Sequence, residues 1–303
     1  MSKVILVTGA SSGIGRRIAA TLARNGHRVF GTSRHPKSDI LDGFELTQLD
    51  VTSDESARAC VQAVLQKAGH IDVLVNNAGI ELLGALEEVS LDEARQLFET
   101  NFFGVARMCN LVLPHMRERK SGQIVNISSI SGFTFAPFQG YYAASKHALE
   151  GYSAALKLEV EPFGVDIALV EPGYFKSEIG AKRIQAQSSV AAYDRARKRF
   201  LPNWERHITN GADPQPVADV VLQIVEERSN GFRHVVGGPI AQVSRLSVIS
   251  PHRVTTAIVR RYVGLRPLRK DLPWGVAVLA SFYALLQIRS FFKRLKSRDR
   301  NND

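Results

Sequence analysis

The stretch that decides the fold is Thr8-Gly9-Ala10-Ser11-Ser12-Gly13-Ile14-Gly15. It follows the apolar run 4–7, which predicts a β-strand, and leads into the segment 15–25, which predicts a helix. Small residues at such a turn let backbone N–H groups approach a pyrophosphate at the positive end of the helix. Three glycines can also form a plain tight loop, but the strand-to-helix context favours nucleotide binding.

Beyond this turn, short apolar runs alternate with helical segments over the first 240 residues. The expected strands are 4–7, 28–31, 45–50, 73–75, 123–127, 165–170 and 233–236. The expected helices are 15–25, 54–68, 91–118, 142–161 and 216–228. This alternation predicts one α/β domain of the Rossmann type, a doubly wound seven-stranded parallel sheet with helices on both faces.

The composition is that of a globular chain: 303 residues, of which 45% are hydrophobic and 22% charged. These values exclude disordered, collagen-like and disulfide-stapled chains. Cys60 and Cys109 lie far apart and form no CxxC pair, so we expect reduced, buried thiols and no metal site. No signal peptide precedes the first strand, which predicts a cytoplasmic protein.

The net charge of +10 is concentrated at one end of the chain. Residues 245–303 hold 13 Lys and Arg against 3 Asp and Glu, which leaves 26 of each kind in residues 1–244. A neutral body with a basic extension argues against a nucleic-acid-binding fold. We therefore expect a catalytic domain at 1–244 and a separate helical extension at 245–303.

Further motifs follow the expected strands in order. Asn76-Asn77-Ala78-Gly79 comes after the fourth strand, Asp50-Val51 ends the third, and Pro172-Gly173 follows the sixth. Together with the glycine turn, over about residues 3–240, they resemble the short-chain dehydrogenase/reductase family. The resemblance implies that Asn77, Ala78 and Gly79 border a nicotinamide cofactor, that Asp50 and Val51 hold its adenine ring, and that Pro172 and Gly173 line its nicotinamide side.

The reactive group is suggested by Tyr142-Ala143-Ala144-Ser145-Lys146. Residues four apart share one face of a helix, and a nearby positive charge lowers the pKa of a phenol from about 10. Ser129 precedes Tyr142 by thirteen residues, which is the family's spacing between its catalytic serine and tyrosine. Tyr141 and Ser128 compete for these roles but lack that spacing, while an exposed Tyr–Lys pair on a helix face is the simpler alternative.

The resemblance implies hydride transfer between nicotinamide and a carbonyl or alcohol carbon. Tyr142 would be the general acid or base, Ser129 would donate to the substrate oxygen, and Lys146 would hold the nicotinamide ribose and keep the phenol acidic. Asn101 matches the family's fourth catalytic position, which steadies a water chain; an asparagine satisfied by helix backbone is the alternative. A cofactor-binding sensor or scaffold without turnover remains the other functional class.

The end of the second strand favours NADP(H) over NAD(H). NAD enzymes place an acidic side chain there to accept from the ribose 2′-hydroxyl. This chain has no Asp or Glu between Gly15 and Asp39; instead Arg34 is placed to pair with a 2′-phosphate and Ser33 to add a hydrogen bond. Arg16 and Lys37 either contribute or are solvated surface charges.

The substrate side is less defined by the sequence. Residues 173–212 form a long connection after the sixth strand, typical of a lid over a ligand site. Aromatic residues near the expected catalytic segments predict an apolar cavity or, equally, ordinary core packing: Phe133, Phe135, Phe138, Tyr174 and Phe175. The pattern resembles the hydroxysteroid and retinol dehydrogenase branch, which implies a small apolar carbonyl or alcohol substrate and a homo-oligomer.

The extension contains two apolar segments. Residues 250–264 predict an amphipathic helix, and 272–288 are seventeen residues without a charge, followed by several Arg and Lys. A spanning helix needs about 20 apolar residues. A helix at the bilayer interface with its cations on anionic headgroups fits better, and a helix packed on the body or on a dimer partner is the alternative.

Overall fold

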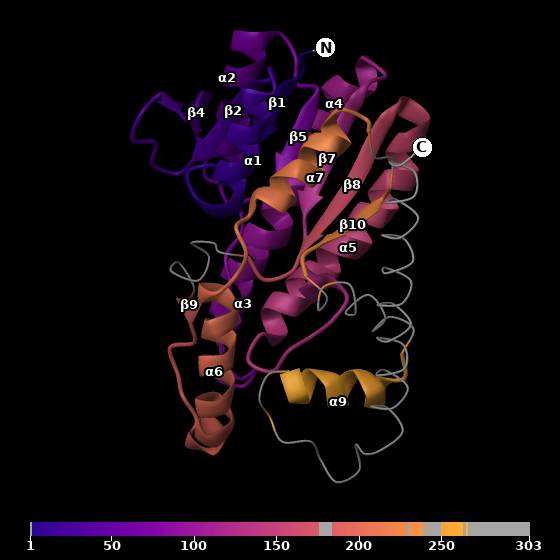
Figure 1. Cartoon of the computed structure of the whole chain (residues 1–303). Coiled ribbons are helices and arrows are strands. Elements are labelled where there is room, and N and C mark those ends of the chain that lie inside the picture. The colour runs from indigo at the N-terminus through magenta and orange to yellow at the C-terminus, as the bar shows by residue number, and fades with distance from the viewer. Residues whose placement is uncertain are drawn as a thin grey trace, which may run out of the picture. The chain divides into compact units, whose positions relative to one another are not determined.

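The structure is a computed structural model and describes residues 2–175, 184–228, 231–238, 241, 250–262 and 265. The chain divides into two compact units, Met1–Arg245 and Leu246–Asp303, and each is described by itself. Within the first unit, strands and helices alternate along the chain (Figure 1).

The strands of the first unit are β1 (Val4–Val7), β2 (Arg28–Ser33), β3 (Ile40–Leu41), β4 (Phe44–Gln48), β5 (Val73–Asn76), β6 (Leu82–Leu83), β7 (Gly122–Ile127), β8 (Val165–Pro172), β9 (Ile184–Gln185) and β10 (Arg233–Val236). Its α-helices are α1 (Gly13–Arg24), α2 (Asp54–Ala68), α3 (Leu91–Phe98), α4 (Gly104–Glu118), α5 (Gly140–Val160), α6 (Asp194–Thr209) and α7 (Gln215–Val225). Each expected strand and helix is present, with ends shifted by a few residues, except that the segment 91–118 is divided.

The central sheet confirms the Rossmann-type prediction but has, among the described residues, eight strands rather than seven, in the order β10-β8-β7-β5-β1-β2-β4-β3. Every pairing is parallel except that of β3 with β4. The extra strand arises because Asp42 and Gly43 both adopt positive φ, +47° and +86°. An Asp-Gly pair of this kind makes the two-residue turn of a β-hairpin, a signal that the sequence contains and that our prediction missed.

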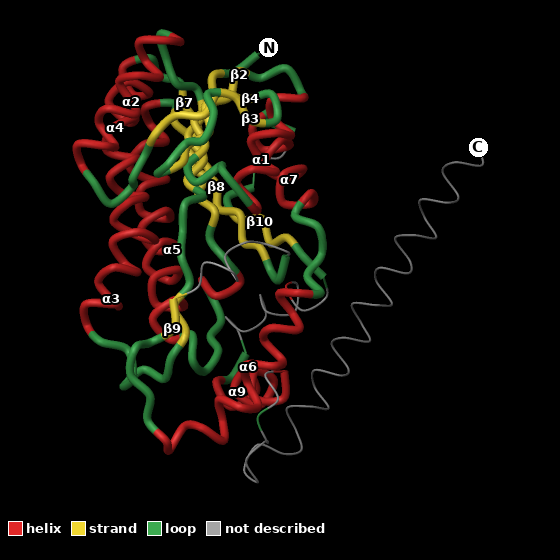
Figure 2. Tube along the Cα trace, turned by 90° about the vertical axis from the view of Figure 1, so that its left-hand side faces the viewer, coloured by secondary structure: helices red, strands yellow, loops and turns green. Residues whose placement is uncertain are grey.

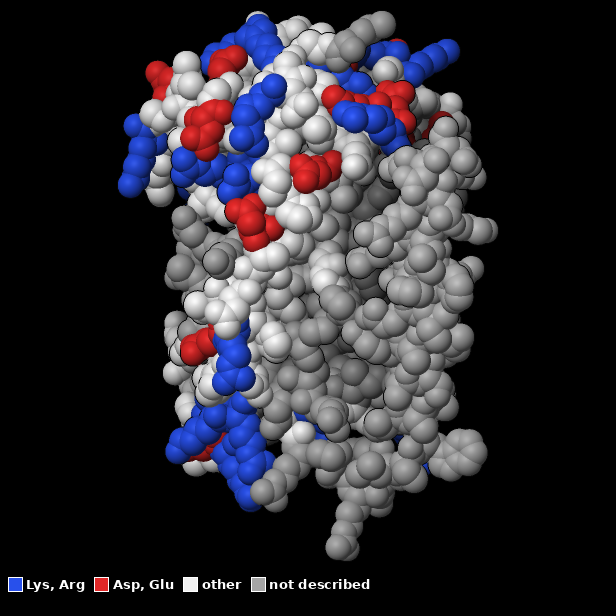
Figure 3. All heavy atoms as spheres, in the orientation of Figure 1, with Lys and Arg blue, Asp and Glu red and all other residues white. Residues whose placement is uncertain are grey.

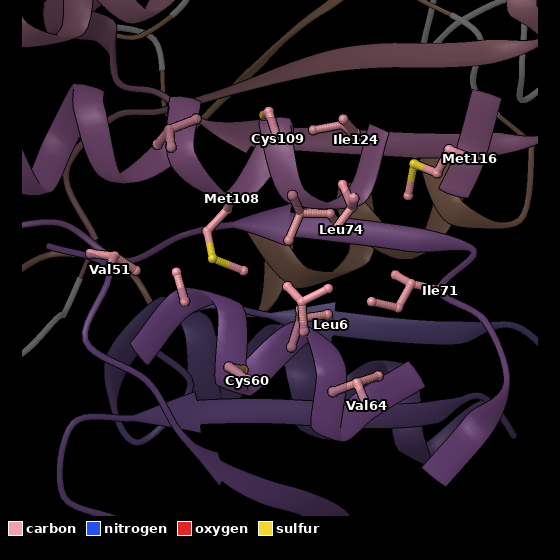
Figure 4. Packing of buried hydrophobic residues seen from close by; sticks show 14 of the residues in the cluster. Leu6, Val51, Cys60, Val64, Ile71, Leu74, Met108, Cys109, Met116 and Ile124 are labelled. Atoms are coloured by element: carbon pink, nitrogen blue, oxygen red, sulfur yellow. The ribbon is translucent and has the colours of Figure 1, made fainter. Parts of the chain in front are cut away.

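The sheet is covered on both faces (Figure 2). Alternate residues of β1 point to opposite faces, so that Leu6 packs with α2, α4 and α5, and Ile5 packs with α1 and α7. Figure 4 shows the first of these cores, with Met108 and Cys109 of α4 against Leu74 of β5 and Cys60 of α2 near Leu6. Both cysteines are free and buried, as predicted.

The strand order places a topological switch point between β1 and β5, which are neighbours in the sheet. From β1 the chain adds strands outward in one direction, and from β5 it adds them in the other. Ligands of doubly wound folds bind beyond the carboxyl ends of the strands at such a point. The glycine turn follows β1 and the Asn-Asn-Ala-Gly segment follows β5, so both motifs lie at this crevice.

The segment 91–118 is divided by a π-helical turn at Glu99–Phe103 between α3 and α4. Such wide turns break the regular helix and often occur at functional sites. Here the turn carries Asn101, which is completely buried.

Outside the sheet, β6 and β9 form a short parallel pair, and α6 follows β9. Figure 3 shows Lys and Arg side chains gathered over α6, in contrast to the mixed charges over the upper part of the unit. In the second unit the structure describes helix α9 (His252–Tyr262), within the predicted helix 250–264. The apolar segment 272–288 lies outside the described residues, and within the part that is described every helix is too short or too polar to cross a membrane.

Candidate active site

The turns after β1 and β5 are locked together by Thr8 and Asn77. The Thr8 Oγ1 accepts from the backbone N–H groups of Asn77 and Ala78, at 2.9 and 3.0 Å. In return, the Asn77 Nδ2 donates to the carbonyls of Thr8 and Gly9. A Cβ on Gly15 would lie 2.3 Å from the Asn77 Nδ2, so only glycine allows this approach.

The N-terminus of α1 fits a phosphate group. The N-cap is Ser12, whose side chain makes no capping hydrogen bond, and the first turn contains no acidic residue. The first N–H groups of a helix lack partners within it and carry a partial positive charge. Ser11, Gly13 and Ile14 are half-buried around this terminus, and Ile14 also lines the pocket described below. The residues present are therefore those that a dinucleotide pyrophosphate requires.

The residue after β2, Arg34, is an exposed arginine whose charge acts on Asp50. Arg34 is exposed, next to the half-buried Ser33. Burial opposes ionisation of Asp50, but hydrogen bonds from Thr52 and the positive charges of Arg34 and Arg107 hold the pKa of the Asp50 carboxyl below its usual range. Val51, the other residue predicted to hold the adenine ring, is buried.

Arg16, the other arginine near this edge, is engaged elsewhere. Its Nε donates to the Asp42 carboxylate at 2.6 Å, and its Nη2 to the same group at 3.1 Å. Arg34 is therefore the better-placed cation of the two for an anionic group beyond β2.

One pocket brings the predicted reactive residues together. Its described lining includes Ser129, just beyond β7, and, one turn apart on α5, Tyr142 and Lys146. Pro172 and Gly173 at the carboxyl end of β8, the parallel neighbour of β7, also line it. The Ser129 hydroxyl accepts from the Ser131 N–H at 3.1 Å, and its interaction with the Tyr142 phenol acts to lower the pKa of that phenol. The Lys146 ammonium donates to the Ile127 carbonyl at 3.0 Å and lies 6.0 Å from the centre of the Tyr142 ring.

The competing residues lie differently. Ser128 also lines the pocket, but its buried hydroxyl has no hydrogen-bond partner, whereas Ser129 is the serine that acts on the pKa of Tyr142. Tyr141 packs against the small apolar cluster around Leu82 and is absent from the described pocket lining. The geometry thus favours Ser129 and Tyr142 for the predicted roles.

Asn101 supports the pocket from behind. Its amide Oδ1 accepts from the Ile80 N–H and its Nδ2 donates to the Ile80 carbonyl, both at 2.9 Å. The same Nδ2 donates to the Ser145 hydroxyl at 3.2 Å. Asn101 therefore ties the loop after β5 to α5, and it is satisfied by that loop rather than by the backbone of its own helix.

The ionisation of the pocket differs from what the Tyr–Lys spacing suggested. Burial raises the pKa of Tyr142, the negative charge of Glu81 raises it further, and the hydrogen bond with Ser129 opposes both. Burial also lowers the pKa of Lys146 to about 8, against the charge of Glu150. The expected lowering of the phenol pKa by its lysine neighbour is not seen: Lys146 is not among the groups that shift it, and burial is the largest effect.

Two further pocket residues, Glu81 and Gln139, did not emerge from the sequence. Glu81 is 4% exposed, although it lies only two residues beyond the Asn-Asn-Ala-Gly motif. Gln139 caps the start of α5 and donates to the Glu81 carboxylate at 2.5 Å. The proximity of Glu81 to the motif was the one available signal.

Two of the five candidate aromatic residues line the pocket and three lie outside its described lining. Tyr174 and Phe175 line the pocket, and so does Ile208 of α6. Phe138 instead packs its ring against Phe200 of α6, with ring centres 5.3 Å apart. The remaining two lie elsewhere: Phe133 beneath the Arg233 guanidinium and Phe135 partly in solvent.

Comparison with known proteins identifies the family. The sequence profile described as "short chain dehydrogenase" matches residues 3–188. The chain belongs to the short-chain dehydrogenase family. It is therefore an oxidoreductase of a family that binds nicotinamide cofactors, and the glycine turn, the Asn-Asn-Ala-Gly segment and the Tyr–Lys pair lie within the matched region.

Relatives of this short-chain dehydrogenase act on different molecules. A protein of Bacteroides thetaiotaomicron named 3-ketodihydrosphingosine reductase is 42% identical over 243 residues, 80% of this chain and 90% of its own. A Bos taurus protein named retinol dehydrogenase 8 is 38% identical, covering 74% of this chain and 78% of its own. A metagenomic short-chain oxidoreductase solved in complex with NADP superposes with a TM-score of 0.61 at 27% identity, over 78% of this chain and 97% of its own.

Proposed function

We propose that the protein is an NADP(H)-dependent oxidoreductase that interconverts an apolar ketone or aldehyde and the corresponding alcohol. The observation that carries this proposal is the convergence of Ser129, Tyr142 and Lys146 on one pocket beside the helix terminus that fits a pyrophosphate. Bound nicotinamide supplies the hydride chemistry. The residues of the chain supply alignment and proton transfer.

Tyr142 is the proton donor for carbonyl reduction. Because burial and Glu81 raise the pKa of this phenol, it is protonated at neutral pH, the form that can donate to a carbonyl oxygen. Ser129 lines the same pocket as Tyr142 and is placed to donate to the same oxygen, where negative charge develops. The two hydroxyls together therefore orient the carbonyl and are placed to stabilise the charge that develops on its oxygen during reduction.

Lys146 and Asn101 hold this arrangement in place. Lys146 is directed to the end of β7 by its hydrogen bond to Ile127, where its ammonium is placed to bind the nicotinamide ribose. Asn101 fixes the loop that carries Gly79 and Glu81, and we assign it a positioning role through Ile80 and Ser145.

The preference for NADP(H) rests on Arg34 and Ser33. No acidic side chain lies between Gly15 and Asp39 to accept from a ribose 2′-hydroxyl and repel a phosphate. Arg34 is exposed at the end of β2, where a 2′-phosphate would pair with it. The bound NADP of the metagenomic relative agrees with this preference.

The apolar character of the substrate is supported by the pocket wall and by the relatives. Tyr174, Phe175 and Ile208 face the pocket, and the last comes from α6, within the segment that we assign as a lid. The names of the relatives point to lipid-like molecules, a long-chain keto base in one and a retinoid in the other.

The direct test is an enzyme assay on the full chain. Oxidation of NADPH and of NADH is followed with long-chain ketones, retinal and a steroid ketone. We expect turnover with at least one of these and a lower KM for NADPH than for NADH. Cofactor binding without turnover on any of them would favour the alternative of a sensor or scaffold.

We also propose that the protein acts at a membrane surface. The extension carries ten more cationic than anionic side chains, and α6 is itself rich in Lys and Arg. Polybasic segments bind anionic headgroups. The full chain should sediment with vesicles that contain phosphatidylserine, whereas a version that ends at Lys270 should stay in the supernatant. Equal sedimentation of both versions would refute a role for residues 271–303 in membrane binding.

A further inference from the structure

Glu150 is a buried carboxylate on α5, one helical turn beyond Lys146. Residues four apart on a helix share a face, with about 5–6 Å between their Cβ atoms. Lys146 is 6% exposed and Glu150 is 7% exposed, so both charges are removed from water. Lys146 has a place in the proposed reaction and Glu150 has none. Burying a carboxylate is costly unless the charge is paired and hydrogen-bonded, so its presence here requires an explanation.

The Glu150 side chain is held by β10 and by the turn after β7. Arg233 of β10 donates from its Nη2 to the Glu150 Oε2, and its guanidinium lies 5.8 Å from the centre of the Phe133 ring. A Cβ on Gly132 would lie 2.6 Å from the Glu150 Oε1, so the 3₁₀ turn Ile130–Gly132 packs directly on the carboxylate. The position of this charge relative to α5 is therefore fixed.

The same arginine also holds a second buried carboxylate. The Arg233 Nε donates to the Glu171 Oε1 at 2.7 Å, and Glu171, on β8, is 1% exposed. A single guanidinium that faces two carboxylates gives these three side chains one more negative than positive charge. The ammonium of Lys146, on which Glu150 acts, brings the sum over the four side chains to zero. Glu150 is thus shared between two cations, one from β10 and one from the active site.

The charge of Glu150 acts on the group that we assign to the cofactor. Burial lowers the pKa of Lys146 to about 8, and the charge of Glu150 opposes that lowering. Without the carboxylate, Lys146 would therefore lose its proton at a lower pH. The charged form has three N–H donors. One of them is directed to the Ile127 carbonyl at 3.0 Å, and the others are available to the hydroxyls of a ribose.

The other titratable side chains in the described lining of the pocket come from three elements. Tyr142 precedes Lys146 on α5, Glu81 follows β5, and Tyr174 follows β8. Burial raises the pKa of both tyrosines, that of Tyr174 to about 12, so both stay neutral from neutral pH to about pH 10. Glu81 acts on these two tyrosines, whereas Glu150 is the carboxylate that acts on Lys146.

We propose that Glu150 is a positioning residue for the cofactor: fixed by Arg233, it keeps the neighbouring Lys146 in the ammonium form that binds the nicotinamide ribose. The inference rests on the proposed function and names the residue that sets the pH range over which the cofactor is held. Glu150 touches neither substrate nor cofactor in this role, because it acts through Lys146.

This role also explains why an ion pair is buried behind the pocket. The desolvation of two charges largely cancels their attraction, so a buried ion pair adds little to the stability of a fold. The Arg233–Glu150 pair instead gives the carboxylate a fixed place next to Lys146. A neutral side chain at position 150 would leave the ammonium with the full effect of burial on its pKa.

The test measures the Kd of NADPH for the full chain between neutral pH and about pH 10, by cofactor fluorescence and without substrate. In the wild type the Kd should increase as the pH rises through about 8, because the ammonium is lost. In Glu150→Gln, which keeps the shape of the side chain, the midpoint of this increase should lie about one pH unit lower, the scale of one nearby charge. Glu171→Gln is the matched control: it removes the other carboxylate partner of Arg233 and should leave the midpoint in place.

An unchanged midpoint in Glu150→Gln, or an equal shift in Glu171→Gln, would assign Glu150 a structural role and overturn the inference while leaving the proposed function intact. A wild type that does not bind NADPH would overturn both. The expected shift in a protein that reduces no ketone would support the inference and count against the proposed turnover alone.

A second variant decides if Glu150→Gln fails to fold, as judged by its melting temperature. Arg233→Gln removes the competing cation and leaves Glu150 beside Lys146, so the midpoint should move to higher pH, opposite to the shift in Glu150→Gln. A midpoint that stays in place or moves to lower pH in Arg233→Gln would overturn the inference.

Discussion

The two walls of the active-site pocket are built in different ways. The cofactor-side wall consists of the turns after β1, β5 and β8, where small residues such as Gly79 and Gly173 line the pocket and Gly15 packs against Asn77 of the wall. The substrate-side wall consists of side chains from four separate segments, namely Glu81, Gln139, Tyr174 and Phe175, and Ile208. Tyr142 stands between them. A dinucleotide has the same shape in every member of a family, so its wall depends on backbone, whereas the substrate wall is free to vary.

This difference has an energetic counterpart. Substitutions on the cofactor-side wall meet backbone or short side chains that cannot move away, so we expect them to affect folding and cofactor binding together. Those on the substrate-side wall change charge and shape in a space left for a ligand. They should affect selectivity more than stability.

The largest effect is expected where the walls meet, at Tyr142. Tyr142→Phe removes the proton donor and keeps the ring, so we expect kcat to fall by about 10³-fold while NADPH binding is retained. Ketone-dependent NADPH oxidation measures the first and cofactor fluorescence the second. Tyr141→Phe is the matched control and should keep nearly full activity; an active Tyr142→Phe enzyme would refute the assignment.

A second prediction concerns the buried ammonium of Lys146. Its pKa falls from 10.5 to about 8 on folding, so between these pH values the unfolded chain binds more protons than the folded one. The free energy of unfolding should therefore rise with pH across this window, by about 3 kcal/mol at most. Below pH 8 both states hold the proton, and the cost of the buried charge is fully present.

Urea unfolding of the wild type and of Lys146→Met at pH 7.5 and at pH 10 measures this effect. The variant lacks the titrating group, so the wild type should gain stability relative to it as the pH rises. Parallel behaviour of the two proteins, or a relative loss for the wild type, would contradict the burial of a charged Lys146.

The cofactor-side wall is tested by Gly15→Ala. The new Cβ would meet the Asn77 Nδ2 at 2.3 Å and the Gly9 carbonyl at 2.4 Å, and neither group can withdraw without breaking the lock between the turns. We expect a loss of about 2 kcal/mol in the free energy of unfolding, together with weaker cofactor binding. Gly151→Ala on α5 meets nothing within 4 Å and should instead stabilise its helix, by about 0.5–1 kcal/mol. Equal changes in the free energy of unfolding of the two variants would contradict the difference that we predict between the tightly packed Gly15 and the open position of Gly151.

The two walls of the pocket also differ in how well the sequence predicts them. The alternation of apolar runs and helical segments predicted the Rossmann-type fold, and the local Tyr–Lys spacing predicted that Tyr142 and Lys146 share one face of α5, as they do in the pocket. The Asp42-Gly43 hairpin was also local and was overlooked. Glu81 and Gln139 lie 58 residues apart and become neighbours only through the packing of the β5 loop on α5, so no local pattern could have paired them.

The smallest effect is expected at the edge of the cofactor-side wall, where Arg34 is exposed to solvent. An exposed ion pair is screened by water and salt, so removing it costs far less than a change inside the pocket. We expect Arg34→Ala to raise the KM for NADPH by about tenfold and to leave that for NADH nearly unchanged, because only NADPH carries the 2′-phosphate. Arg117→Ala, at the exposed end of α4, is the matched control and should change neither value. A rise in both Michaelis constants would show that Arg34 supports the adenine site as a whole. No change in either constant would show that Arg34 does not bind the 2′-phosphate. If Arg34 pairs directly with the 2′-phosphate, the tenfold rise in the KM for NADPH should become smaller as the salt concentration increases. Salt screens an ion pair but does not change the shape of the wall.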